Sequence, residues 1–252
     1  MACGGVVDNR VKENSNRKLS GVGKQIEAVR RIRGFNRLRV AQESDISKTR
    51  LDEIINGRYD PKIEIVDQIA KGLDIPSDYL LIPYHRDFMA FAVDGYLARI
   101  DPMLLKDTLS DVWVLINDSY IDERYIFDFI SDLENKQNRS QTFLPPRENI
   151  KQYRKRLGFT QAQAAEAIGV SYNHYVKYEN GFTAFSFANH LLLCRLLRKP
   201  SECITQARPD VILDLKLWNF LFNLKTDRLF MLLELLRTIY EDRKNNSMER
   251  ER

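Results

Sequence analysis

Two short runs of polar side chains, each placed directly after a serine, carry hydrogen-bonding groups at the start of a predicted helix. The serines are Ser47 and Ser171, and serine is a favoured residue at a helix N-cap. The runs comprise Lys48, Thr49, Arg50 and Asp52 in the first case and Tyr172, Asn173, His174 and Lys177 in the second. Asparagine can bond bidentately to adenine, and lysine can reach the acceptors of guanine. These residue types predict the reading of base edges in a DNA groove.

The two runs lie in a longer pattern that occurs twice. Residues 34–57 and 158–181 align without a gap, so that Gly57 corresponds to Gly181 at an offset of 124 residues. A single copy could arise by chance, but two collinear copies in one chain are much less expected. Repetition of this kind indicates a repeated structural unit. We therefore predict two copies of one small module.

In each copy the polar run is preceded by another short helix. These preceding helices are predicted over 37–44, with Leu38 and Ala41 facing inward, and over 161–167. A small residue is needed where two helices cross closely, and Ala41 and Ala165 supply it. The second helix of each pair then carries its exposed polar residues away from the crossing.

The turn between the paired helices needs a residue that tolerates a positive φ. Gly169 meets this requirement without strain, and Asp45 meets it at a modest cost. A short turn of this kind sets the two helices at a fixed angle, so that the second can enter the major groove. We refer to these second helices as the groove helices.

The pattern along the chain predicts an all-α protein with several segments. They are a flexible tail (1–17), a first helix-turn-helix domain (18–83), an acidic helical spacer and linker (84–146), a second helix-turn-helix domain (147–205) and a C-terminal helical segment (206–252). The net charge of the chain is +4, with basic charge gathered on the two modules and acidic charge on the spacer. A polyanion is therefore expected to be attracted to the modules and repelled by the spacer.

Both modules resemble the Cro and lambda-repressor-like family of phage and bacterial regulators. The second module carries the family's motifs as Thr160-Gln161, Ala165, Gly169-Val170-Ser171 and Glu179-Asn180-Gly181, but has Thr183-Ala184 where a proline is usual. The first carries Val40-Ala41, Ile46-Ser47, Asn56-Gly57, Pro61 and a closing helix at Ile75–Leu80. The first departs from the family at Arg37, Asp45 and Ile55. The resemblance implies two five-helix modules and covers roughly half of the chain.

The resemblance also implies which residues contact DNA. They are Arg37, Lys48, Thr49, Arg50, Asp52, Arg58, Gln161, Tyr172, Asn173, His174 and Lys177. Arg37 and Gln161 begin the helix where the family contacts phosphate and braces the groove helix. The carboxylates of Asp52 and Glu53 repel phosphate, so the first module is either the weaker reader or a contact for protein.

The C-terminal segment has two interpretations. Its apolar residues cover more than one face of a helix. One interpretation is homodimerisation on a palindromic operator through Leu229, Leu232, Leu233, Leu236 and Tyr240. The other is a helix that packs entirely inside its own chain.

Several other functions are not favoured by the sequence. His190, Cys194 and Cys203 have a spacing that a metal site would use, but core packing explains them better, so neither metal nor cofactor is expected. No phosphate-binding loop or nucleophile motif indicates an enzyme. Three cysteines cannot all pair within one chain, which fits a reducing cytoplasm, and no apolar run suits a membrane helix.

The sequence therefore predicts a sequence-specific, DNA-binding transcriptional regulator of bacterial, phage or mobile-element type, acting at the nucleoid. Its partners would be double-stranded DNA, a second copy of the chain, and RNA polymerase or another regulator. Two alternatives stay open at this point. One is an adaptor, such as an antirepressor or antitoxin, whose modules bind another regulator. The other is a non-specific nucleoid or maintenance factor.

Overall fold

The computed structural model describes residues 21–100, 146–205 and 221–250. Within these ranges every regular element is a helix and no strand occurs, which confirms the predicted all-α class. The predicted tail over 1–17 and the part of the predicted spacer over 101–145 lie outside the described residues. Among the described helices, none combines the length and the hydropathy that a membrane-spanning segment requires.

The first domain begins with a helix over residues 21–32, which turns Val22, Ile26 and Val29 inward at helical spacing. It continues with α2 (Arg37–Glu43), α3 (Lys48–Ile55), α4 (Ile63–Gly72) and α5 (Ser77–Leu81). A short 3-10 helix, η1 (Ile82–Tyr84), then leads into α6 (Asp87–Leu97). Almost all of α6 is buried, because it lies between α5 and the C-terminal helix.

One inward residue of α2 was predicted wrongly. Leu38 is 50% exposed, and the buried residues of the helix are Val40 and Ala41. Successive residues of a helix are rotated by about 100°, so Leu38 points nearly opposite to Val40. The crossing with α3 and α4 therefore uses the face that carries Val40 and Ala41, and Leu38 lies on the solvent side.

The second domain repeats this arrangement. Its helices are α9 (Pro146–Arg156), α10 (Gln161–Ile168), α11 (Tyr172–Glu179), α12 (Phe187–Leu197) and α13 (Ser201–Thr205). Its core is built around Ile150, Ala165 and Tyr175, with the predicted small residue at the helix crossing. A long helix, α15 (Thr226–Arg250), follows and packs along α6 of the first domain.

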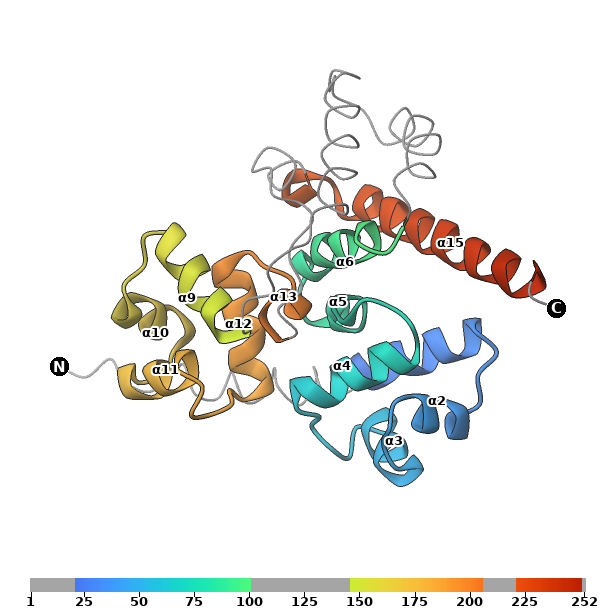
Figure 1. The fold of residues 1–252 in the computed structure, drawn as a ribbon, viewed down its shortest axis with the longest axis horizontal. Helices are drawn as coiled ribbons and strands as arrows, with labels where there is room; N and C mark the ends of the chain where they lie inside the picture. The colour runs from blue at the N-terminus through green and yellow to red at the C-terminus, as the bar shows by residue number, and fades with distance from the viewer. Residues whose placement is uncertain (1–20, 101–145, 206–220, 251–252) are drawn as a thin grey trace, which may run out of the picture.

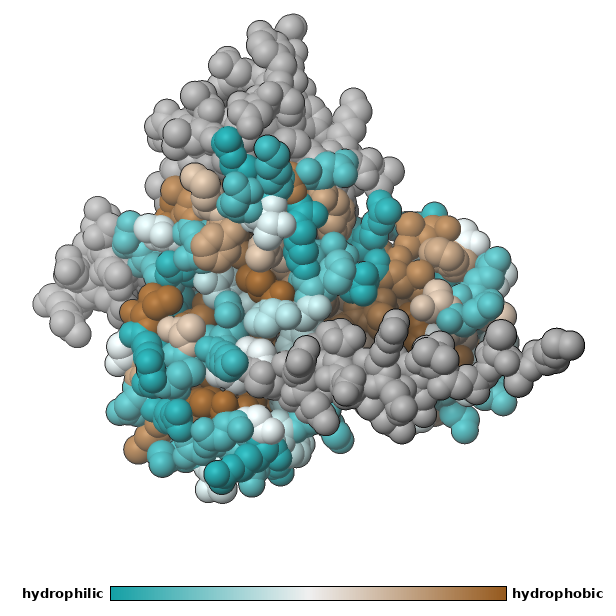
Figure 2. Space-filling view, turned by 180° about the vertical axis from the view of Figure 1, so that it is seen from behind, coloured by the Kyte–Doolittle hydropathy of each residue, from teal (hydrophilic) through white to brown (hydrophobic). Residues whose placement is uncertain are grey.

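The two domains meet at their closing helices. In Figure 1, α5 and α13 lie at the centre, and the two helices contact each other. The groove helices lie below them, α3 in the first domain and α11 in the second, and α6 and α15 lie above. The buried side chains of both domains form one continuous hydrophobic cluster. Seen from behind, the first domain presents a largely hydrophilic face, whereas apolar side chains gather on the second domain (Figure 2).

Candidate nucleic-acid interface

Both groove helices, α3 and α11, start on a capped and exposed first turn. The Ser47 hydroxyl accepts a hydrogen bond from the Arg50 backbone N–H at 3.1 Å, and the Ser171 hydroxyl accepts one from the His174 backbone N–H at 3.3 Å. These bonds satisfy N–H groups that a helix start would otherwise leave unpaired. The predicted caps are therefore confirmed.

The leading side chains of both groove helices point to solvent. Lys48 and Thr49 are exposed on α3, and Tyr172 and Asn173 are exposed on α11. The turns before these helices adopt the predicted left-handed backbone, with φ of 51° at Asp45 and 73° at Gly169. Each groove helix is thus presented at a fixed angle with its leading side chains turned toward solvent.

In the second domain, a buried ion pair holds the groove helix against α9, the first helix of the domain. The Arg154 guanidinium donates to both carboxylate oxygens of Glu179, at 2.7 and 2.8 Å, and to the Phe159 carbonyl at 2.7 Å. Burial pushes the pKa of Glu179 upward, but the hydrogen bonds and charge of Arg154 outweigh it and leave this pKa lowered. Glu179 therefore stays ionised and ties the end of α11 to α9.

Gln161 extends this brace to the start of α11. Its side-chain amide donates to Glu179 at 3.2 Å, and its carbonyl oxygen accepts from the Tyr172 hydroxyl at 3.5 Å. The bracing role that the resemblance implied for Gln161 is present in the structure. Contact of Gln161 with phosphate stays a prediction.

In the first domain, Arg37 takes the place of Gln161 and makes a different set of bonds. Its guanidinium donates to Asp52 at 2.9 Å and to Glu27 at 3.3 Å. Lys48 also lies 3.4 Å from Asp52. Hydrogen bonds from Arg37 and then Lys48 lower the pKa of Asp52 despite some desolvation. The Asp52 carboxylate, which was expected to repel phosphate, is thus paired with two cations of the same surface.

Glu27 compensates for the isoleucine that the first domain has at position 55. Arg30 corresponds to Arg154 and donates to the Phe35 carbonyl in the same way, at 2.5 Å. Because Ile55 stands where the second domain has Glu179, Arg30 pairs with Glu27 instead, at 2.5 Å. The hydrogen bond from Arg30 is the largest cause that lowers the pKa of Glu27 to about 2. Sequence reasoning missed Glu27, although its spacing from Arg30 and Arg31 on one helix could have indicated it.

The remaining residues that were predicted to contact DNA differ in how far they are exposed and in the partners they have. Arg58 is exposed just beyond α3, and Lys177 is exposed on α11. Arg50 lies 3.2 Å from Glu53 and stacks over the Tyr59 ring. His174 is half-buried, with its ring 5.3 Å from that of Phe185, so only part of it faces solvent. Contact of these side chains with DNA stays a prediction.

The residues predicted to dimerise lie inside the chain. Leu229, Leu232, Leu233 and Leu236 are buried where α15 packs on α6. The Tyr240 hydroxyl donates to Asp74 at 3.1 Å, and its ring lies 5.9 Å from that of Tyr96. One chain therefore accounts for the burial of these leucines without a partner. Homodimerisation remains a prediction that needs another surface or a rearrangement of α15.

The histidine and cysteines with metal-like spacing form a buried cluster. The His190 ring is 2.9 Å from the Ser201 hydroxyl and 3.3 Å from the Cys194 sulfur. Burial lowers the pKa of His190 to about 4 and raises that of the Cys194 thiol. Across the described residues, no three histidine, cysteine or carboxylate side chains form a group that could hold a metal ion.

Comparison with known protein families identifies the repeated unit. A family model described as a helix-turn-helix domain matches residues 23–84, and a second, described as helix-turn-helix, matches residues 150–202. No curated protein and no solved structure shows significant similarity to the chain. The matched segments coincide with the two domains whose groove helices are α3 and α11. The chain therefore contains two helix-turn-helix domains of the Cro and lambda-repressor-like type.

Proposed function

We propose that this protein is a sequence-specific DNA-binding transcriptional regulator of bacterial, phage or mobile-element type. The observation that supports the proposal is that both domains present a capped groove helix with an exposed first turn. Buried or braced contacts hold each groove helix from behind, so its leading side chains are preorganised for a groove. The role proposed is binding, not catalysis.

The side chains of the groove helices and their surroundings would make two kinds of contact with DNA, one to base edges and the other to phosphate. Lys48 and Asn173 lead their helices and suit base edges, guanine for lysine and adenine for asparagine. Arg37, Arg58 and Lys177 suit phosphate, which fixes position without reading sequence. Occupancy of an operator would regulate transcription in the cytoplasm, either by blocking RNA polymerase or by recruiting it.

A titration over a salt series tests this function. Fluorescence anisotropy would compare random duplexes with fragments of the host genome between 50 and 200 mM salt, roughly the range over which phosphate contacts weaken strongly. A sequence-specific regulator binds some fragments far more tightly than random DNA and shows a steep salt dependence. A salt dependence without preference would indicate a non-specific nucleoid factor. A protein that shows neither sequence preference nor salt dependence would instead be an adaptor that binds another regulator.

Asn173→Ala tests base reading directly. We expect it to lose about 1–3 kcal/mol of preference for the best fragment over random DNA, because an asparagine–adenine pair contributes about that much. Binding to random DNA should change little. Asn223→Ala, at an exposed asparagine outside both domains, is the matched control. Equal losses on specific and random DNA would show that Asn173 does not read a base.

A further inference from the structure

The junction between the two domains is built from equivalent helices. The sequence Pro76-Ser77-Asp78 leads into α5, and Pro200-Ser201-Glu202 leads into α13, which keeps the offset of 124 residues found in the groove helices. The residues that lead into them, Asp74 and Arg198, both have a left-handed backbone, with φ of 53° and 50°. The internal repeat thus extends through the helices that join the domains.

These equivalent residues bond to each other across the junction. The Ser77 backbone N–H donates to Glu202 at 2.9 Å, and the Ser201 backbone N–H donates to Asp78 at 2.9 Å and 3.2 Å. All four residues are at most 1% exposed. Each domain therefore caps the closing helix of the other with a buried carboxylate.

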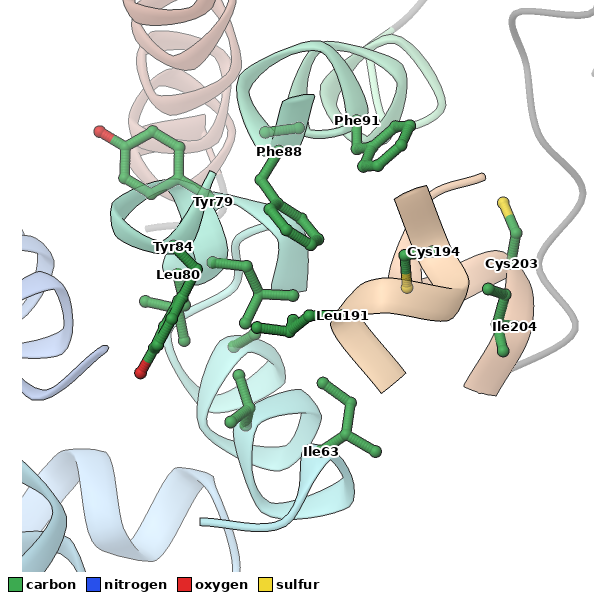
Figure 3. Close-up of a cluster of buried hydrophobic side chains, with 14 of the residues drawn as sticks. Ile63, Tyr79, Leu80, Tyr84, Phe88, Phe91, Leu191, Cys194, Cys203 and Ile204 are labelled. Atoms are coloured by element: carbon green, nitrogen blue, oxygen red, sulfur yellow. The ribbon is translucent and has the colours of Figure 1, made fainter. Parts of the chain in front are cut away.

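Apolar contacts surround these reciprocal caps. The Tyr84 and Phe187 rings pack edge to face with centroids 5.2 Å apart. Leu191 of α12 belongs to the same buried cluster as Leu80 and Phe88 of the first domain (Figure 3). The Arg99 guanidinium lies 2.8 Å from Glu202, so this carboxylate is paired as well as hydrogen-bonded. Buried polar groups that are fully satisfied hold an interface in one geometry.

Reciprocity of contacts identifies the symmetry of the junction. In an interface with two-fold symmetry, residue i of one unit contacts residue j of the other, and j contacts i. Ser77 with Glu202 and Ser201 with Asp78 satisfy this rule once the offset is applied. The two domains are thus arranged like the subunits of a two-fold dimer, although they belong to one chain. A simple head-to-tail tandem would not produce reciprocal contacts.

We propose that a single chain binds one operator made of two unlike half-sites in inverted orientation. The inference rests on the proposed function. A two-fold arrangement points the two groove helices in opposite directions along a duplex, which requires inverted half-sites. In two-fold helix-turn-helix proteins, such half-sites lie about one helical turn, or a multiple of it, apart. The half-sites must differ, because α3 leads with Lys48 and Thr49 whereas α11 leads with Tyr172 and Asn173. A dimer of two identical helix-turn-helix domains would instead read two identical halves.

Selection from a random duplex library by the full chain tests the proposal. We expect the enriched sequences to share two different motifs with inverted orientation and a fixed spacing. Mass photometry on an enriched duplex should show one chain bound per duplex. A palindrome with two chains per duplex would overturn the inference but keep the proposed function. A library without enrichment would overturn both.

Changing the geometry of the enriched duplex makes the test independent of any protein variant. Inserting five base pairs between the motifs moves them to opposite faces of the DNA, since a turn is about 10–10.5 base pairs. We expect at least a tenfold loss of affinity, and a similar loss when one motif is reversed to form a direct repeat. Unchanged affinity in either duplex would overturn the fixed two-fold arrangement.

The reciprocal caps can be tested in the protein. Asp78→Asn with Glu202→Gln keeps the shapes and removes both buried charges. We expect the variant to lose most of its discrimination against the five-base-pair insertion while it still binds a duplex with one motif. Glu64→Gln, at an exposed glutamate of α4, is the control. Retention of the full spacing preference by a folded double variant would overturn the role of the caps.

Discussion

At the scale of single residues, the first groove helix is governed by the partners of its own charges. Asp52 accepts from Arg37 and lies near Lys48, and Glu53 lies near Arg50. Each cation that would otherwise face phosphate is thus partly neutralised in the free protein. Exposed pairs of this kind are weak, about 0–1 kcal/mol, so DNA can compete for the cations. The first domain is therefore expected to contribute less non-specific affinity than its basic residues suggest.

Asp52→Ala tests this competition. We expect tighter binding to random duplexes and a salt dependence steeper by about 1 in the log–log slope, because Lys48 becomes free for phosphate while Arg37 keeps Glu27 as a partner. Anisotropy titration over a salt series measures both quantities. Asp227→Ala makes the same change of charge at the exposed start of α15 and should leave the slope nearly unaltered. A slope that does not change in Asp52→Ala would mean that Lys48 does not reach phosphate.

At the scale of elements, the turn before each groove helix decides how that helix is presented. Both turns use a left-handed residue, and the second uses glycine, whose added Cβ would meet no atom within 4 Å. A substitution at Gly169 therefore tests backbone conformation alone, without a steric clash. The equivalent turn of the first domain, at Asp45, shows that a polar side chain can be accommodated in the same conformation.

Gly169→Ala should lower the free energy of unfolding by about 1–2 kcal/mol, since an L-residue with Cβ resists a φ of 73°. Gly169→Asn should cost less, because asparagine tolerates this region. Urea denaturation followed by circular dichroism measures both changes. If alanine and asparagine have equal and negligible effects, the left-handed turn does not limit the stability of the second domain.

At the scale of the whole molecule, α15 belongs to the core of the chain. It packs along α6, and the Tyr79 hydroxyl donates to Glu234 at 2.6 Å. Phe230 and Met231 lie on the opposite side of α15 and are about half exposed. Any association of two chains through α15 would therefore use this exposed side and not the buried leucines.

Leu233→Ala and Met231→Ala separate these two sides of α15. Leu233 is fully buried, so its truncation should cost about 2–5 kcal/mol of stability. Met231→Ala should change stability by no more than about 0.5 kcal/mol. Chemical denaturation gives the stabilities, and sedimentation gives the mass. A Leu233→Ala protein that keeps its stability but loses a dimer would show that α15 packs between chains.

The junction of the domains should make the molecule sensitive to mild acid. His190 is fully buried beside Ser201, and its pKa falls to about 4 in the folded state. Its contribution to stability is complete above pH 6.5 and is lost as the pH falls toward 4, because the unfolded chain binds the proton first. Linkage gives a loss of about 2 kcal/mol between pH 7 and pH 5. Urea midpoints at both pH values measure it.

His190→Leu should remove most of that loss, because the buried titrating group is gone. His174→Gln, at a half-exposed histidine of α11, should leave the pH dependence in place. The carboxylates contribute mainly at lower pH, where the stability due to Glu27 is lost as the pH falls from about 4.5 toward 2. An unaltered pH dependence in His190→Leu would assign the acid sensitivity to another group.

The sequence by itself determined the local features of this protein. The repeated helix pairs, the caps at Ser47 and Ser171 and the positive φ at Asp45 and Gly169 depend on residues within a few positions of one another. Local backbone preferences and short-range hydrogen bonds are therefore enough to predict them. The limits of the predicted domains and the contacts of their side chains with DNA stay predictions.

Tertiary structure alone decided how these features are combined. The pairing of Arg37 with Asp52, the burial of Leu233 and the exposure of Leu38 depend on which faces meet. The reciprocal caps join residues more than 120 positions apart, such as Ser77 and Glu202. No short-range pattern encodes such pairs, because their partners are brought together only when the closing helices of both domains pack.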